Sequence, residues 1–210
     1  MNELTQQAVQ APAAPPKRKR ALKTAGTVLA LAAGLVIGRM GMNALLGDGA
    51  PDDAGRYRLT PPASFQSLAL QNSGPRVDAI KQGQGPAKAG ATNVAVVYAD
   101  QSGTARLVVS GAFGRFGDQD PGAALTQSLQ GMGSVSGVTT HEAGAPTGGA
   151  MRCGTLDVGS GAGTLPLCMW ADHSTLVTVT VPVENQPMAI DALASQARAL
   201  REAMEVPTAS

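Results

Sequence analysis

The chain has 210 residues, of which 43% are hydrophobic and 15% are charged, and its formal net charge at pH 7 is +1. The charge is divided unevenly: residues 1–47 carry six basic groups and one acidic group, whereas residues 48–210 carry ten basic and fourteen acidic groups. A mildly acidic main body argues against a nucleic-acid partner, because that affinity comes largely from basic contacts to phosphates. Aromatic residues make up only 3% of the chain, so we expect Val, Leu, Ala and Met to form the core.

Residues 1–23 form a tail rich in Gln, Ala and Pro that ends in a basic cluster, Lys17 to Arg20 with Lys23. A segment of this composition buries too little apolar surface to offset the entropy of ordering it, so we expect disorder. The basic cluster favours contact with anionic lipid headgroups.

Residues 24–47 are apolar and are interrupted only by Arg39. They are long enough to cross a bilayer, which takes about 20 residues, and the long Arg39 side chain can reach the interface. The positive-inside rule then places the tail in the cytoplasm and everything after residue 47 outside. We therefore predict a single-pass protein of the cell membrane, held in the lipid bilayer through residues 24–47, with its C-terminal domain extracellular.

A cleaved secretory signal is the alternative to an uncleaved anchor. The uncharged run before Arg39 has the length of a signal core, and the small residues Ala44 and Ala50 follow it. Cleavage would produce a secreted form. Gly34 and Gly38 have a spacing that lets two membrane helices approach closely, which is weak support for a homodimer.

Residues 48–63 are predicted to be a linker, because Asp, Gly and Pro are frequent there and Pro61-Pro62 excludes regular helix. We expect one folded domain over residues 64–206 and a short tail over residues 207–210. The fold class is predicted as α+β, a mostly antiparallel sheet of about five strands with a long C-terminal helix and one or two shorter helices.

The expected strands are Val-rich or alternating runs separated by turn residues: residues 94–99, 105–111, 151–158, 164–170 and 174–181, with residues 135–141 as a further candidate. The expected helices begin at prolines or carry apolar residues at helical spacing: residues 75–82, 118–131 and 187–206. The wide apolar stripe of the last helix predicts that it packs on the sheet.

Two cysteines lie in neighbouring strand candidates on either side of a Gly-rich turn. Antiparallel pairing centred between Ser160 and Gly161 places Cys153 directly opposite Cys168, a register in which a disulfide needs no distortion of the chain. The predicted topology puts both thiols in an oxidising compartment. A redox-active pair is disfavoured, because no Cys-x-x-Cys spacing exists and no Lys or His flanks Cys168. We predict a structural bridge.

Trp170 shares the predicted face of the two cysteines and has two interpretations. The simpler one is core packing against the sulfur atoms. If the helices cover only the opposite face of the sheet, Trp170 would instead be a residue of a ligand-binding face.

The sequence suggests no catalytic, cofactor-binding or metal-binding residues. Asp172-His173-Ser174 has the residue types of a hydrolase triad, but three consecutive residues cannot converge in that geometry, and turn hydrogen bonds are the simpler expectation. His141 and His173 with scattered carboxylates do not make a zinc set. Residues 111–114 and 159–163 are Gly-rich, but no Lys follows them as in phosphate-binding loops.

Three stretches carry a resemblance to known proteins: Tyr57-Arg58-Leu59 with the prolines after it, LVVSGAFGR from Leu107 with the later Asp120-Pro121, and LPLCMWAD from Leu165. They resemble a group of uncharacterised single-pass membrane-anchored proteins of streptomycete-type actinobacteria. The resemblance covers about residues 57–206 and implies an envelope location, a shared fold and a bridge to the Cys before Trp-Ala-Asp. The group has no assigned activity, so no functional residue follows from it.

We expect a non-catalytic module of the cell envelope that binds a protein partner, a peptide or a cell-wall component, or that relays a signal to the tail. A small envelope enzyme or enzyme accessory is the alternative, and a scaffold for a neighbouring membrane protein is a third. An enzyme predicts a concave pocket where His or carboxylate groups converge. A binding module predicts an exposed apolar patch or an uncovered sheet face.

Overall fold

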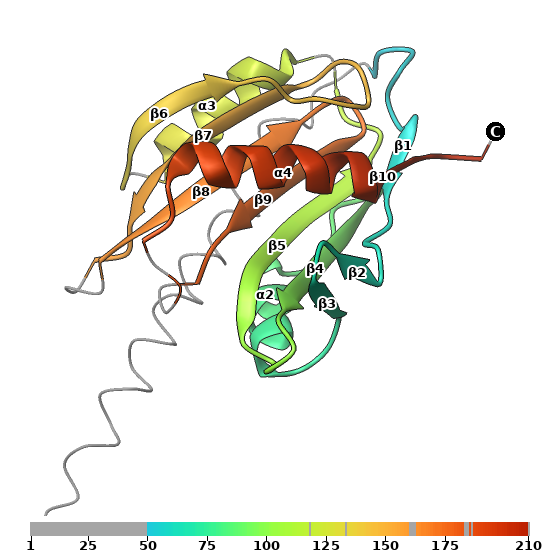
Figure 1. Cartoon of the computed structure of the whole chain (residues 1–210). Coiled ribbons are helices and arrows are strands. Elements are labelled where there is room, and N and C mark those ends of the chain that lie inside the picture. The colour runs from blue at the N-terminus through green and yellow to red at the C-terminus, as the bar shows by residue number, and fades with distance from the viewer. Residues whose placement is uncertain are drawn as a thin grey trace, which may run out of the picture.

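The computed structural model describes residues 50–209 except residues 118, 133, 160–162, 183, 184 and 186. This part of the chain is an α+β domain with an eight-stranded antiparallel sheet and three helices (Figure 1). The predicted tail and membrane segment, residues 1–47, lie outside the described residues. None of the helices between residues 50 and 209 combines the length and hydropathy that a membrane span needs.

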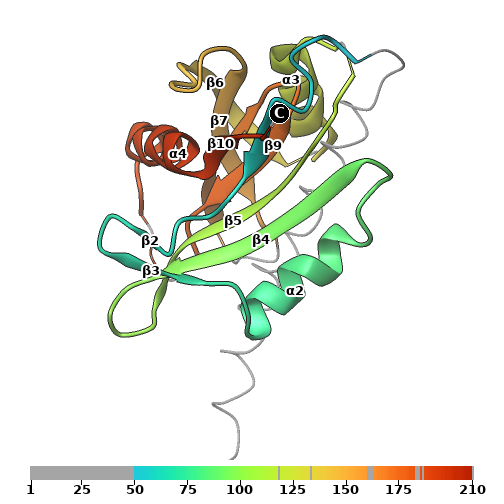
Figure 2. The same ribbon diagram turned by 90° about the vertical axis from the view of Figure 1, so that its right-hand side faces the viewer.

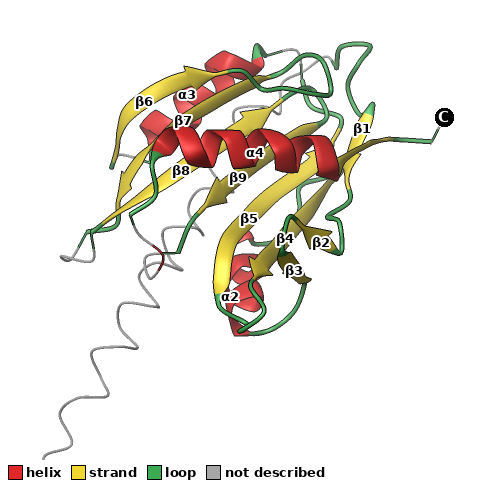
Figure 3. Ribbon diagram, in the orientation of Figure 1, coloured by secondary structure: helices red, strands yellow, loops and turns green. Residues whose placement is uncertain are grey.

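The large sheet has the strand order β2-β3-β4-β5-β9-β8-β7-β6 (Figure 3). Its strands are β2 (Ser64–Phe65), β3 (Leu68–Gln71), β4 (Ala91–Ala99), β5 (Ala105–Gly114), β6 (Val135–His141), β7 (Ala150–Asp157), β8 (Thr164–Ala171) and β9 (Thr175–Thr180). A separate two-stranded sheet pairs β1 (Tyr57–Leu59) with β10 (Glu205–Pro207). The helices are α2 (Pro75–Gln84), α3 (Pro121–Gly131) and α4 (Ile190–Met204).

Helices cover both faces of the sheet (Figure 2). On one face, Leu193, Ala197 and Leu200 of α4 pack against buried residues from β4, β5, β7, β8 and β9. On the other face, α3 packs on β7 and β8, and α2 packs on β4. The predicted stripe of the C-terminal helix and its packing on the sheet are therefore confirmed.

The prediction of about five strands was too low. The strands beyond that number include β2 and β3, which are two and four residues long. Such short runs carry little alternating pattern, and β3 owes its strand state to pairing with β4, which lies beyond an intervening helix. Tertiary contact, more than local propensity, makes them strands.

Part of the range predicted as a linker, residues 48–63, is folded. Tyr57 pairs with Pro207 and Leu59 pairs with Glu205, so the start of the domain is tied to its end. Ala54 and Leu59 are buried. Because the partner strand lies at the other end of the chain, the local sequence of this segment carries no sign of the pairing.

The predicted disulfide forms. Cys153 is paired directly with Cys168 in the β7–β8 ladder, and the two residues are joined with a Cα–Cα distance of 4.1 Å. The predicted faces are also confirmed, because Met151 and Trp170 lie with the cysteines under α4, whereas Leu156 lies in the core beneath α3. A buried disulfide is consistent with an oxidising, extracytoplasmic environment for this domain.

Candidate functional site

Trp170, the residue considered for a ligand-binding face, lies in the core beneath α4. Its side chain is fully buried, and the indole Nε1–H donates a hydrogen bond of 2.6 Å to Glu205 Oε1. Because helices cover both faces of the sheet, Trp170 has no exposed surface with which to meet a ligand. Packing against the disulfide is the interpretation that the structure supports.

The Asp172-His173-Ser174 stretch connects β8 to β9 and forms a turn stabilised by side-chain hydrogen bonds, as predicted. Asp172 Oδ1 accepts hydrogen bonds of 2.7 Å from the backbone N–H groups of Ser174 and Thr175. The Ser174 hydroxyl donates to the backbone oxygen of Asp53 at 3.2 Å. Asp172 and Ser174 are thus held by structural bonds, and among the described residues the hydrogen bond of the His173 ring is to Asp53 and not to either of them.

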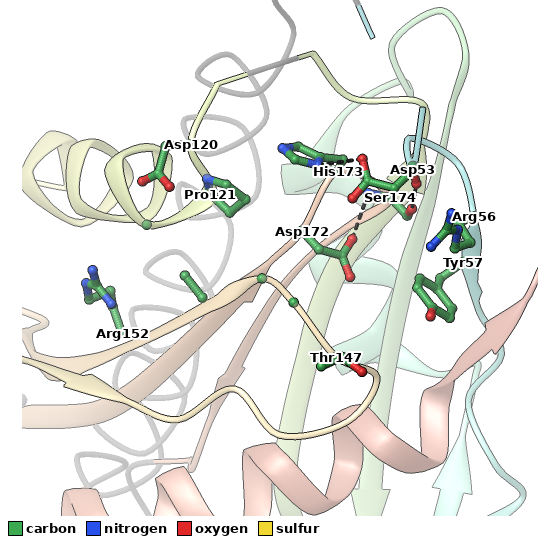
Figure 4. Close-up of a pocket in the computed structure, with 14 residues that line it drawn as sticks. Asp53, Arg56, Tyr57, Asp120, Pro121, Thr147, Arg152, Asp172, His173 and Ser174 are labelled. Carbon is green, nitrogen blue, oxygen red and sulfur yellow. Dashed lines mark hydrogen bonds and ion pairs between the residues drawn. The ribbon is translucent and has the colours of Figure 1, made fainter. Parts of the chain in front are cut away.

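A pocket of about 410 Å³ lies beside this turn. We call it the His173 pocket; four segments that are distant in sequence form it (Figure 4). Its lining residues are Asp53, Arg56 and Tyr57 before and in β1; Asp120, Pro121 and Gly122 at the start of α3; residues 147–150 and Arg152 at the start of β7; and Asp172, His173 and Ser174.

The buried side chain of Arg201 contacts two residues on one side of the pocket, Asp172 and Gly148. Arg201 of α4 has no exposed side-chain surface, and its Nη2 lies 3.0 Å from Asp172 Oδ2. Its Nη1 donates to the backbone oxygen of Gly148 at 3.0 Å. At Gly149, where φ is +82°, an added Cβ would lie 2.5 Å from the Ala171 backbone oxygen. Glycine is therefore required there for the 147–150 segment to lie against Arg201.

Glu205 completes the buried charge cluster. Its carboxylate accepts hydrogen bonds from Arg201 Nε at 3.0 Å, from Trp170 and from the Thr175 hydroxyl. Burial, and then the negative charge of Asp172, raise the pKa of Glu205 to about 7, although Arg201 and the hydrogen bonds act in the opposite direction. Residues of α4, β8, β9 and β10 thus meet in one cluster that touches the pocket at Asp172 and Gly148.

An Asp–His pair forms another part of the wall. His173 Nδ1 lies 2.9 Å from Asp53 Oδ1, and the His173 side chain is 23% exposed. The hydrogen bond from His173 is the main reason why the pKa of Asp53 lies below its ordinary value. This pair joins the β8–β9 turn to the segment that precedes β1.

Two arginines lie on opposite sides of the pocket (Figure 4). Arg56 precedes β1 and is exposed, whereas Arg152 is half-buried in β7. Within the described part of the chain, neither guanidinium forms an ion pair with a carboxylate. An added Cβ on Gly122 would lie 3.0 Å from Arg152 Nη2, so this guanidinium rests against the first turn of α3.

The sequence drew attention to Asp172, His173 and Ser174 as one motif, but it did not indicate that Asp53, Arg56 and Arg152 would lie beside them. The signals present were the Gly148-Gly149 pair and Asp120-Pro121, which mark a turn and a helix start and do not by themselves indicate a ligand. The described residues include no cluster of three or more His, Cys, Asp or Glu residues suited to a metal ion. No family model, curated protein or solved structure matches the chain.

Proposed function

We propose that the chain is an extracytoplasmic binding module tethered to the cell membrane, with the His173 pocket as its ligand site. The main support is a pocket of about 410 Å³ that Arg56 and Arg152 line without carboxylate partners among the described residues. The hydroxyl of Ser174, the serine in its lining, donates to the Asp53 backbone oxygen. A small polar ligand or the end of a peptide fits this volume.

Outside the His173 pocket, the described residues expose little large apolar surface. Val138 is the exposed large hydrophobic residue of this part of the chain, at 41%, and a single such residue does not make a docking patch. The expected apolar patch of a binding module is absent from the described residues. We therefore propose that the pocket, and not a sheet face, binds the ligand.

The proposed location follows from the basic cluster, the apolar segment and the disulfide. Lys17 to Arg20 precede the apolar residues 24–47, and the Cys153–Cys168 bridge fits an oxidising compartment. A membrane or cell-wall component is the proposed source of the ligand, and we propose no catalytic, cofactor or metal role.

Photocrosslinking in native membranes tests this proposal. A benzophenone amino acid replaces Thr147 at the pocket, and in a matched variant it replaces the exposed Asp78 on α2. We expect crosslinked species from the Thr147 variant that mass spectrometry identifies and that the Asp78 variant lacks. Identical patterns from the two variants would contradict binding at the pocket.

An enzyme is the second candidate, and the Asp53–His173 pair is the observation that favours it. A carboxylate that holds one ring nitrogen orients a histidine as a general base. If the pair is catalytic, molecules captured at the pocket will be converted by the wild type and not by H173Q. If the pocket only binds, mass spectrometry will recover them unchanged from both.

A further inference from the structure

The charges around the His173 pocket differ in whether they already have partners. Asp53 is paired with His173 and Asp172 with Arg201, whereas Asp120 keeps its charge and caps α3, with Oδ1 accepting the Ala123 backbone N–H at 2.7 Å. Neither lining arginine forms an ion pair with a carboxylate in the described residues, and Arg152 Nη1 donates to the Met151 backbone oxygen at 3.2 Å. Both guanidinium groups therefore keep N–H donors that an anionic ligand can engage.

The positions of the arginines restrict the shape of the ligand. Arg56 comes from the chain before β1 and Arg152 from β7, and Figure 4 shows them on opposite sides of the pocket with Asp172 and His173 between them. A ligand that contacts both arginines has to extend across the pocket and carry negative charge at both ends.

We infer that the His173 pocket binds an elongated molecule with an oxyanion group at each end, one held by Arg56 and the other by Arg152. Guanidinium groups bind carboxylates and phosphates through paired charge-assisted hydrogen bonds. The part between the ends would lie along Thr147 and His173, which offer a hydroxyl and a ring nitrogen. This inference rests on the proposed function and adds the chemical class of its ligand.

Simple dianions test the inference with the full chain in detergent micelles. Glutarate, pimelate and azelate have carboxylates at increasing separation, hexanoate has one carboxylate, and propane-1,3-bisphosphonate replaces carboxylates by phosphonates. Binding is followed by saturation-transfer NMR of the probe. We expect millimolar or tighter binding of at least one dianion and weaker binding of hexanoate, with the preferred length reporting the separation of the two arginines.

Variants then locate the binding. R56Q and R152Q should each weaken the best dianion at least about tenfold, the usual effect of losing a charge-assisted pair. R58Q is the matched control, because Arg58 is an exposed neighbour in β1 that does not line the pocket. R56Q removes an exposed side chain, so it keeps the test valid if R152Q misfolds.

The outcomes distinguish a carboxylate ligand from a phosphate ligand. They also distinguish failure of this inference from failure of the proposed function. Preference for a dicarboxylate indicates a carboxylate ligand, and preference for the bisphosphonate indicates a phosphate ligand; either supports the inference. Equal binding of hexanoate and the dianions, an equal effect of R58Q, or no binding at all overturns it. Crosslinks specific to Thr147 would then still support a binding site, whereas their absence would remove the proposed function itself.

Discussion

Arg201 is the residue on which the pocket and the core both depend. Its guanidinium is fully buried and contacts Asp172, Glu205 and the backbone oxygen of Gly148. Burying an ion has an unfavourable desolvation free energy, which is offset only where the ion is paired and its remaining hydrogen-bonding groups are satisfied. The cluster meets that condition, because Trp170 and Thr175 supply further donors to Glu205.

Replacing Arg201 by Met should destabilise the domain strongly. The variant leaves Asp172 as a carboxylate without its buried cation and removes the charge that favours ionised Glu205. Breaking a buried pair from one side costs about 3–5 kcal/mol. Urea denaturation followed by circular dichroism measures this loss. R58M is the control, because Arg58 is exposed; if R201M and R58M have equal midpoints, the cluster does not stabilise the fold.

Glu205 should make the stability of the domain fall as pH rises from about 5 to 8. Its pKa is raised from 4.5 to about 7 in the folded state, so the folded protein binds more protons than the unfolded chain between those values. Stability is therefore highest at the acidic end of this window and decreases as the carboxyl ionises, by up to about 3 kcal/mol.

The E205Q variant isolates this effect, because both histidines remain in it. Urea midpoints for wild type and E205Q at pH 5 and pH 8 give the contribution of Glu205 as the difference between the two pH dependences. The Asp53 carboxyl, whose pKa is lowered, titrates below this window and does not interfere. Parallel pH dependences in the two proteins would show that Glu205 does not titrate there.

At the scale of elements, two features fix the register of the β7–β8 hairpin: the disulfide, and the burial of apolar side chains on both faces of the sheet. Cys153 and Cys168 face α4, whereas Leu156 and Leu165 face α3. A slip by one residue would exchange these faces and bury the wrong side chains. The bridge therefore reinforces a register that the apolar pattern already selects.

Removing both cysteines should lower stability without changing the fold. In C153A/C168A the loss is about 3 kcal/mol, the chain-entropy value for a loop of 15 residues. Urea unfolding of the variant, with and without a reducing agent, measures it. Wild type should respond to the reductant and the variant should not. Non-reducing peptide mapping that found two free thiols in the mature wild type would contradict the bridge.

A substitution at Gly122, in the first turn of α3, should change ligand binding without a matching loss of stability. In G122A the new methyl carbon would lie 3.0 Å from Arg152 Nη2 and 3.2 Å from Asp120 Oδ1, so the guanidinium, at the end of a flexible side chain, has to shift slightly. Helix propensity favours Ala over Gly by up to about 1 kcal/mol. Because this gain opposes the crowding of the Asp120 cap, we expect little change in stability by urea denaturation, and weaker dianion binding by NMR.

The control for G122A is A123G, one position further along α3, where the side chain is exposed. It should reduce stability slightly and leave dianion binding unaffected, because residue 123 does not line the pocket. If G122A binds dianions as well as the wild type, the position of Arg152 is not important for the ligand.

The sequence predicted those elements that depend on local pattern. Val-rich runs located β4 and β5, and the Asp100-Gln101-Ser102-Gly103 turn joins them as expected, with Asp100 Oδ1 accepting the Ser102 and Thr104 N–H groups. The cysteine spacing predicted one register correctly. The apolar stripe of α4 identified its buried side.

What the sequence did not reveal depends on contacts between distant segments. Arg201 lies in a helix whose sequence has the usual amphipathic pattern. Only the fold shows that its guanidinium is buried between Asp172 and Glu205. The His173 pocket likewise joins residues more than one hundred positions apart, such as Asp53 and His173. Neither partner has a local pattern that identifies the other.

At the scale of the whole molecule, the pocket lies close in sequence to the predicted membrane segment. Asp53 and Arg56 line the pocket, and the apolar segment ends at residue 47. An extended chain spans at most about 3.6 Å per residue, so an uncleaved anchor would hold Asp53 within about 20 Å of the end of the span. Ligands would then meet the pocket near the membrane surface, whereas a cleaved signal would release it.

Topology in cells should distinguish these states. The full chain carries an epitope tag before Met1 and alkaline phosphatase, which is active only outside the cytoplasm, after Ser210. We expect active phosphatase, a membrane-bound product and retention of both labels on one polypeptide, because the basic cluster keeps the N-terminus inside. Replacing Lys17 to Arg20 by Glu should lower the phosphatase activity. Activity without the tag would show cleavage, and inactive phosphatase in the unaltered chain would contradict the extracytoplasmic location of the pocket.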